Sequence, residues 1–253
     1  MKLYHIVFSP TGGTKKVTEL LAGGLQGDNV VIDLTDSQQD FRSFVLTPED
    51  VAVISVPSYG GRVPAVAVQR LTMLTGHDAR AILVCVYGNR AYEDTLVELE
   101  DAAKQAGFRV IAAVAAVAEH SIARQFATGR PDAQDEKVLA GFTGQIQAKL
   151  SAQDDREPVL PGNRPYKKAG GAGLVPKPTK DCTQCGVCAA ACPVQAIDRD
   201  NPKKVNDKAC ISCMRCVSVC PSSARKVNPV LLSAVGLALK KVCSERKECE
   251  LFL

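Results

Sequence analysis

The sequence has no tryptophan, and its aromatic residues amount to only 5% of 253 positions. It also has no long hydrophobic run. The best candidates, residues 110–118 and 229–239, fall well short of the 18 or so apolar residues that a membrane span needs. The apolar start, residues 1–8, is too short for a secretion signal. We therefore expect no membrane span, and predict a cytoplasmic protein whose thiols stay reduced.

A strong charge of one sign is also missing, since 31 Lys and Arg stand against 27 Asp and Glu. Residues 1–150 carry 14 basic and 17 acidic side chains, and residues 151–253 carry 17 and 10, so the balance moves from −3 to +7. The basic residues are scattered and have no aromatics among them, which argues against a nucleic-acid partner. With 46% hydrophobic residues, the composition predicts an ordered chain of one or two domains.

Strand-like and helix-like segments alternate through the first 150 residues. Apolar, β-branched runs predict strands at residues 3–8, 30–34, 51–56, 81–87 and 108–118. Helical spacing predicts helices at residues 14–25, 64–74, 92–107 and 132–150. This alternation is typical of an α/β fold, with five parallel strands covered by helices on both faces.

Proline and glycine interrupt this pattern after residue 151. We therefore predict an α/β domain over residues 1–151, a linker over residues 152–179 and a small second domain over residues 180–253. An apolar stretch at residues 229–239 predicts a short helix near the C-terminus.

Eight of the eleven cysteines form two runs of the same spacing, Cys-x2-Cys-x2-Cys-x3-Cys-Pro. The runs are Cys182, Cys185, Cys188 and Cys192, then Cys210, Cys213, Cys216 and Cys220. This is the spacing of bacterial ferredoxins that hold 4Fe–4S clusters, whose iron prefers soft thiolate ligands. The motif implies a crossed ligand set, in which Cys220 completes the first cluster and Cys192 the second.

The competing interpretation is structural zinc, which binds two Cys-x2-Cys pairs around one tetrahedral ion. Zinc requires neither the third cysteine of each run nor the proline that follows the fourth, so two clusters fit better. Of the remaining cysteines, we expect Cys85 in a buried strand, and Cys243 and Cys249 as surface thiols.

A loop of small and hydroxyl residues follows the first predicted strand. Its candidate ligands are Ser9, Thr11, Gly12, Gly13 and Thr14. The loop would lie at a helix N-terminus, where backbone N–H groups and the helix dipole favour a phosphate. It has neither the Gly-Lys-Ser/Thr ending of an ATP-binding loop nor a dinucleotide fingerprint. A monophosphate such as that of FMN therefore fits better than ATP, although a plain turn explains this loop alone equally well.

Two further loops follow the third and fourth predicted strands, at the sheet edge where open α/β sheets bind ligands. Their candidate residues are Pro57, Ser58, Tyr59, Gly60 and Gly61, and then Gly88, Asn89, Arg90 and Tyr92. Each loop carries one tyrosine, so together they offer two aromatic rings for a flat ligand.

With these motifs, the first 150 residues resemble flavodoxin. Ser9-x-Thr11-Gly12-x-Thr14 is similar to the flavodoxin phosphate loop, and the two tyrosine loops are similar to those that cover the flavin faces. The whole chain resembles proteins of anaerobes that fuse a flavodoxin domain to a two-cluster ferredoxin. The resemblance implies a doubly wound sheet of order 2-1-3-4-5, a small α+β ferredoxin-like domain, and FMN with two 4Fe–4S clusters as cofactors.

The tyrosine loops depart from typical flavodoxins in charge. Arg62, Asn89 and Arg90 stand where acidic residues are common, and less negative charge near the flavin should ease its full reduction. His120 follows the fifth predicted strand at the same edge, where it is either a proton donor or a solvated loop residue.

The sequence thus predicts an electron-transfer protein that moves electrons between clusters, FMN and an external redox protein. The alternative is a flavin-dependent reductase of a small molecule, with the clusters as electron input, and an electron carrier is favoured over an enzyme because no catalytic set is visible. The sequence leaves open whether the protein forms a homodimer.

Overall fold

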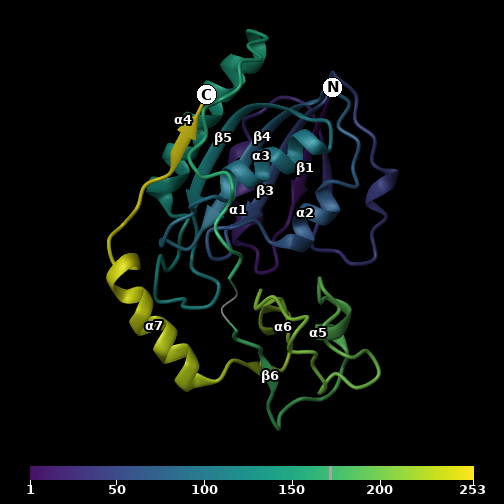
Figure 1. The fold of residues 1–253 in the computed structure, drawn as a ribbon, viewed down its shortest axis with the longest axis vertical. Coiled ribbons are helices and arrows are strands. Elements are labelled where there is room, and N and C mark those ends of the chain that lie inside the picture. Colours follow the sequence, from purple (N-terminus) through teal and green to yellow (C-terminus); the bar gives the residue numbers. More distant parts are fainter. Residues whose placement is uncertain (171–172) are drawn as a thin grey trace.

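A computed structural model describes residues 1–170 and 173–253 of the chain (Figure 1). Two positions of the predicted linker, residues 171 and 172, lie outside the described residues. Within the described part, no helix is both long enough and apolar enough to cross a lipid bilayer.

A six-stranded sheet organises the larger domain, in the order β2-β1-β3-β4-β5-β8. Its parallel strands are β1 (Lys2–Val7), β2 (Asp28–Asp33), β3 (Val51–Pro57), β4 (Arg80–Tyr87) and β5 (Arg109–Val117). β3 and β4 are buried along nearly their whole length, which explains their continuous apolar sequences. The predicted order 2-1-3-4-5 is confirmed, and it is the strand order of flavodoxin-like folds.

Helices cover both faces of this sheet (Figure 1). One face packs against α1 (Gly13–Ala22) and α4 (Ala133–Ser151), and the other packs against α2 (Ala65–Leu71) and α3 (Thr95–Gln105). Neighbouring residues of one strand serve opposite cores, so that Val53 packs on the α1 side and Ile54 on the α2 side. A 3-10 turn, η1 (Phe41–Ser43), lies between β2 and β3.

The sixth strand corrects the expected five-stranded sheet. β8 (Glu250–Phe252) pairs antiparallel with β5, with Val114 beside Leu251. The segment predicted as part of the ferredoxin-like domain thus contributes a strand to the other domain, and three residues are too short to show a strand pattern. Cys243 and Cys249 are buried, so the expectation of surface thiols is wrong, whereas Cys85 lies in the core as predicted.

The smaller unit is built around the cysteine runs. It contains α5 (Val187–Ala190), α6 (Arg215–Ser218) and the antiparallel pair β6 (Lys177–Pro178) and β7 (Arg225–Lys226). The chain then enters α7 (Pro229–Cys243), whose N-terminus is capped by the Asn228 side chain. Figure 1 shows α7 running from the small unit back to the sheet, outside both domains.

Candidate functional site

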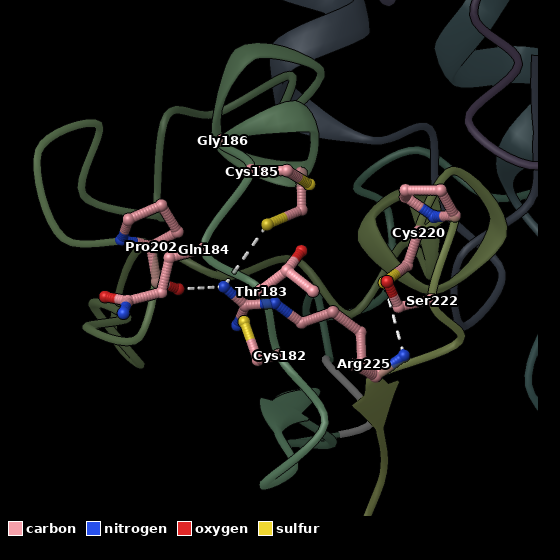
Figure 2. A pocket seen from close by; sticks show the side chains of 12 residues that line it. Cys182, Thr183, Gln184, Cys185, Gly186, Pro202, Cys220, Ser222 and Arg225 are labelled. Atoms are coloured by element: carbon pink, nitrogen blue, oxygen red, sulfur yellow. Dashed lines mark hydrogen bonds between the residues drawn. The ribbon is translucent and has the colours of Figure 1, made fainter.

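The eight cysteines line two separate cavities, four in each. The first, which we call the outer cavity, bounds about 320 Å³ and carries Cys182, Cys185, Cys188 and Cys220. The second, the inner cavity, bounds about 370 Å³ and carries Cys192, Cys210, Cys213 and Cys216. These are the crossed ligand sets that the ferredoxin motif implies. Figure 2 shows the outer cavity with Cys182, Cys185 and Cys220 around it.

The crossing follows from a repeat in the backbone. Each position of the first run has a counterpart 28 residues later, as Cys182 and Cys210 do, and α5 and α6 obey the same offset. Positive φ angles recur at the paired positions, for example 79° at Gly186 and 61° at Met214. A backbone N–H also donates to the last thiol of each run, over 3.3 Å to Cys192 and 3.2 Å to Cys220. The two runs therefore form two copies of one cluster-binding loop.

The thiols of the inner cavity suit a bound metal cluster. Burial raises the pKa of Cys213 to about 12 and also raises the pKa of Cys216 to about 12. Thiols in such surroundings stay protonated unless a metal takes the place of the proton. Among the described residues, no three His, Cys, Asp or Glu side chains converge as ligands of a single ion. Four thiols spread around a cavity fit a cluster better than they fit the tetrahedral shell of one zinc ion.

A buried guanidinium makes the outer cavity suited to a negatively charged cluster. Arg225 is 2% exposed, and its Nε has no hydrogen-bond partner among the described residues. A buried cation is unfavourable without a counter-charge. A 4Fe–4S cluster with four thiolates is an anion, so it would supply that charge at this wall.

The predicted phosphate loop begins α1. Gly12 has a φ of 94°, which favours glycine, and a Cβ there would meet no atom within 4 Å. Thr11 and Gly12 are exposed, whereas the Thr14 side chain is buried beneath the loop. The Ser9 hydroxyl accepts a hydrogen bond from the Lys15 backbone N–H over 2.9 Å. The loop is open and suited to an anion, while Ser9 and Thr14 also stabilise it from within.

The second loop is a tight turn. Tyr59 and Arg62 pair through their backbones across Gly60 and Gly61, whose φ angles are 63° and 86°. The Ser58 hydroxyl hydrogen-bonds the hydroxyl of Thr95 over 2.8 Å. Gly60 and Gly61 therefore form the tip of the turn, Tyr59 lies at its base, and Ser58 is directed toward α3.

The third loop is engaged by the C-terminus. Asn89 is 3% exposed, and its amide nitrogen donates to the carbonyls of Cys243 and Glu245, over 2.7 Å each. The Tyr92 ring lies edge-on to Tyr87, with centroids 5.2 Å apart, and its hydroxyl donates to Glu250. Of the predicted flavin contacts on this loop, Asn89 and Tyr92 thus also anchor the segment 244–253, which we call the strap.

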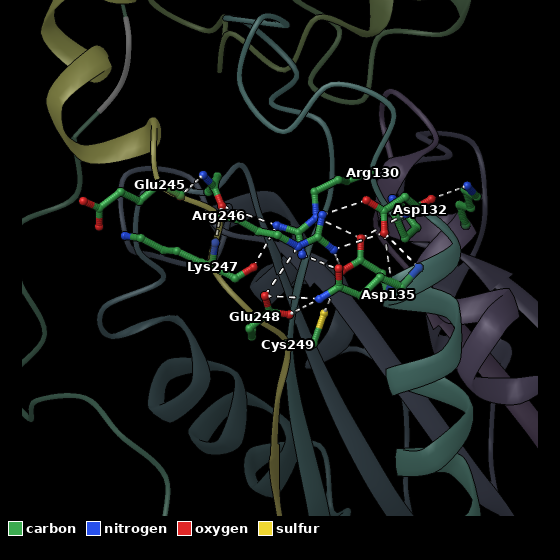
Figure 3. A network of polar contacts seen from close by, with 12 residues as sticks. Arg130, Asp132, Asp135, Glu245, Arg246, Lys247, Glu248 and Cys249 are labelled. Atoms are coloured by element: carbon green, nitrogen blue, oxygen red, sulfur yellow. Dashed lines mark hydrogen bonds and ion pairs between the residues drawn. The ribbon is translucent and has the colours of Figure 1, made fainter.

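A polar network fastens the strap to α4 (Figure 3). Arg130 forms a buried ion pair with Asp135, and Arg246 of the strap bonds to Asp132 and Asp135. Asp132 also caps α4 and forms a capping box with Asp135. The network fixes the strap at the sheet edge that carries the three loops.

The arginines of the tyrosine loops have acidic partners. Arg62 pairs with Glu98 over 2.7 Å, and Arg90 pairs with Glu93 over 2.8 Å. Each pair is locally close to neutral, which reduces the positive charge expected near the flavin. His120 lies against Gly88, and its Nδ1 accepts hydrogen bonds from two backbone N–H groups. Burial lowers the pKa of His120, so this ring is poorly suited to donate a proton.

The inner cavity lies against the larger domain. Arg215, in its wall, donates to the carbonyl of Pro10 in the phosphate loop over 3.2 Å. Arg70 bridges the two domains, since it donates to the carbonyls of Leu34 and Pro193 over 2.6 Å each. Pro193 lines the same cavity. These contacts bring the inner cavity to the edge that carries the flavin loops.

Tyr59 belongs to this junction as well. Burial of its hydroxyl, with a further contribution from the nearby Cys213, holds the pKa of Tyr59 well above its ordinary value. Ile211, in the wall of the inner cavity, packs against the core of the larger domain. A predicted flavin contact and a predicted cluster ligand are therefore near enough to interact electrostatically, although they are far apart in sequence.

Sequence reasoning missed the arginines at these positions. Arg70 and Arg215 gave no signal, because their partners are carbonyls in distant segments. Arg225 did have a signal in the sequence, because the position 28 residues before it, its counterpart in the repeat, is Ile197.

Comparisons with known proteins agree with this division of the chain. Residues 175–221 match the family model described as a 4Fe-4S dicluster domain. A subunit of the polysulfide reductase of Wolinella succinogenes is 36% identical over 55 residues, which cover 20% of this chain and 29% of that protein. The chain thus spans under a third of that relative's length.

Solved flavodoxins overlap with the larger domain. The flavodoxin of Streptococcus pneumoniae TIGR4 has 20% identity and a TM-score of 0.42, over 58% of this chain and 99% of its own. A flavodoxin from the domain Archaea has 12% identity and the same TM-score, over 60% and 99%. At such values the fold assignment rests on the strand order instead.

The strand order and the matched region define a flavodoxin-like α/β domain followed by an iron–sulfur domain of the dicluster type. This is the combination of domains that the sequence predicts, a flavodoxin-like fold followed by a 4Fe–4S dicluster domain.

Proposed function

We propose that this protein relays electrons between an external redox protein and an FMN in the larger domain, through two 4Fe–4S clusters. The observation that carries the proposal is the junction of Cys213, Tyr59 and the phosphate loop, which brings one cluster site next to the predicted flavin site. Similarity to a subunit of a reductase supports a role in electron transfer.

The two cavities differ in exposure, which supports an order for the relay. Cys185 in the outer cavity is exposed, whereas its repeat counterpart Cys213 is only 8% exposed, beside Tyr59. We infer that the external protein docks over the outer cavity and that the inner cavity serves the flavin. Cys213 faces the larger domain rather than solvent, and low exposure of a ligand helps to set the potential of a cluster.

Residues of three loops would hold the FMN. The exposed backbone of Thr11 and Gly12, at the start of α1, is suited to the phosphate, and Tyr59 of the second loop offers an aromatic ring for the flavin. The guanidinium of Arg215 would add a positive charge near Pro10. When bound, the flavin supplies a centre that holds one or two electrons, whereas each cluster exchanges one.

The test is cofactor content after anaerobic purification, followed by stepwise reduction monitored by absorption. We expect about eight iron atoms and one FMN per chain, with the flavin and cluster bands bleaching as electrons are added. Thr11→Glu places a negative charge at the phosphate position and should lose FMN while it keeps its iron. Lys15→Gln is the matched control at an exposed neighbour that should keep both.

Full iron without flavin, even after FMN is added, would refute the proposal and leave a ferredoxin with a docking domain. Turnover of a small molecule at the flavin would instead favour the reductase alternative, for which His120 is a poor proton donor.

A further inference from the structure

Arg225 is a buried cation in the wall of the outer cavity. It begins β7 and is 2% exposed. Its Nη2 donates to the Cys188 thiol over 3.3 Å and to the carbonyl of Pro202, and its Nη1 donates to the carbonyl of Pro176 over 3.4 Å. Figure 2 shows the side chain extending across the cavity, with its guanidinium beside Cys182 and Thr183.

No carboxylate of residues 1–170 or 173–253 pairs with this charge. None of the ion pairs within the described residues includes Arg225, and its Nε is buried without a partner. Packing alone does not require a guanidinium here, because the first run fills the equivalent place with Ile197. Ile197 is 4% exposed and lines the inner cavity, as Arg225 lines the outer one.

The inner cavity has an arginine of its own, Arg215, whose Nε is likewise buried without a partner among the described residues, but its other contacts differ. Arg215 comes from the start of α6, is only half-buried, and directs its Nη1 to Pro10 in the phosphate loop. Among the described residues, no hydrogen bond joins the guanidinium of Arg215 to a thiol. The bond from the guanidinium of Arg225 to the Cys188 thiol therefore distinguishes the outer cavity.

We propose that Arg225 raises the reduction potential of the outer cluster relative to the inner one. Reduction adds one electron, which takes a 4Fe–4S core with four thiolates from a charge of −2 to −3. A fixed positive charge and a hydrogen bond to a ligand sulfur both stabilise the more negative form. The electron comes from the external redox protein, and no proton or bond is exchanged at Arg225.

The proposal rests on the proposed function only in requiring that both cavities hold clusters. It adds that the two clusters are unequal, so that the first electron to arrive resides on the outer one. Arg225 is thus a positioning and tuning residue rather than a catalytic one.

The test is a potentiometric titration of the intact protein with dithionite, monitored by electron paramagnetic resonance. Arg225→Met keeps the length of the side chain and removes its charge. In protein that carries one added electron, we expect the ratio of molecules with a reduced outer cluster to molecules with a reduced inner cluster to fall at least tenfold. For a one-electron couple, this corresponds to a change of 59 mV in the difference between the two reduction potentials. Arg225→Lys keeps the charge without the planar fork and should recover part of that loss.

Lys203→Gln is the matched control, because it removes an exposed cation next to Pro202 of the same cavity. Solvent screens this charge, so the electron distribution should change less than about twofold. A change as large as that in Arg225→Met would overturn the proposal, since any nearby charge would then suffice.

Unchanged potentials in Arg225→Met, with about eight iron atoms retained, would also overturn the proposal and leave the proposed function standing. If Arg225→Met fails to keep its iron, Ile197→Arg gives the converse test. Moving the cation to the inner cavity should raise the potential of the inner cluster, and no change there would refute the inference. Wild-type protein without two clusters would refute the proposed function itself.

Discussion

The outer and inner cavities are copies of one loop, and they differ in what surrounds them. Counterpart residues share backbone conformation, such as the φ angles of 56° at Gln184 and 54° at Ser212. Yet Cys185 is exposed, whereas its counterpart Cys213 is buried. Ligand geometry is thus set by the local sequence, while water access and neighbouring charge depend on the rest of the chain. A repeat can in this way supply two similar clusters with different roles.

The largest effect should come from removing one ligand of each cavity in turn. We expect Cys213→Ser and Cys185→Ser each to lose about half of the iron. Both variants should slow flavin reduction by a small reduced ferredoxin at least tenfold, because the proposed path runs through the outer cluster to the inner one, which adjoins the flavin loops. Stopped-flow absorption measures both rates. A rate that stays nearly unchanged in either variant would mean that the two clusters serve the flavin in parallel, which contradicts the proposed relay.

The next test separates the cavities by loosening only one. Arg70→Ala removes two charge-assisted hydrogen bonds, one of which holds Pro193 of the inner cavity to the larger domain. We expect the free energy that holds the small unit against the larger domain to fall by about 2–3 kcal/mol. Hydrogen exchange should accelerate over residues 211–215 and stay unchanged over residues 183–186. Gln69→Ala, at an exposed neighbour, is the control. Acceleration in both loops would show that the small unit opens as one piece.

A smaller effect is expected from the strap. Asn89→Ala leaves the carbonyls of Cys243 and Glu245 without their donor, at a cost of about 1–3 kcal/mol. Thermal unfolding of the larger domain should shift downward while the iron content stays unchanged. Gln134→Ala, whose contacts to Glu248 are 3.4 and 3.5 Å long, should have little effect. Loss of iron from Asn89→Ala would show that the cavities depend on the strap.

The smallest effect should come from the exposed ion pair between Lys177 and Asp207 in the small unit. Exposed pairs contribute about 0–1 kcal/mol, so Lys177→Ala should leave both cluster potentials and chemical denaturation nearly unchanged. A clear shift would indicate that surface charge, and not burial, distinguishes the two cavities.

The sequence could predict what depends on nearby residues. The cysteine spacing predicts both ligand sets, because a tight loop can bring only certain thiols together. The alternation of strands and helices predicts the sheet, because both of its faces need cover. The prediction of three loops at one edge follows from the parallel order of the strands.

What could not be predicted depends on contacts between distant segments. Asn89 was predicted as a flavin contact, yet its amide also holds a carbonyl 154 residues away. Neither the burial of Cys213 nor the bridge from Arg70 to Pro193 has a local pattern, because each arises only when the two domains dock. The strand β8 is too short for any periodicity to show.

The return of the chain into β8 bears on the modular origin of the molecule. Glu250–Phe252 complete the sheet beside β5. The iron–sulfur unit is therefore inserted between two segments of the larger domain and is not appended after it. Truncation after β7 would remove the edge strand β8 from the larger domain. The backbone of β5 around Val114 would then be free to pair with other chains. The sheet of the larger domain is thus complete only after the iron–sulfur unit has been synthesised. The two domains therefore cannot be exchanged at a single junction in the gene.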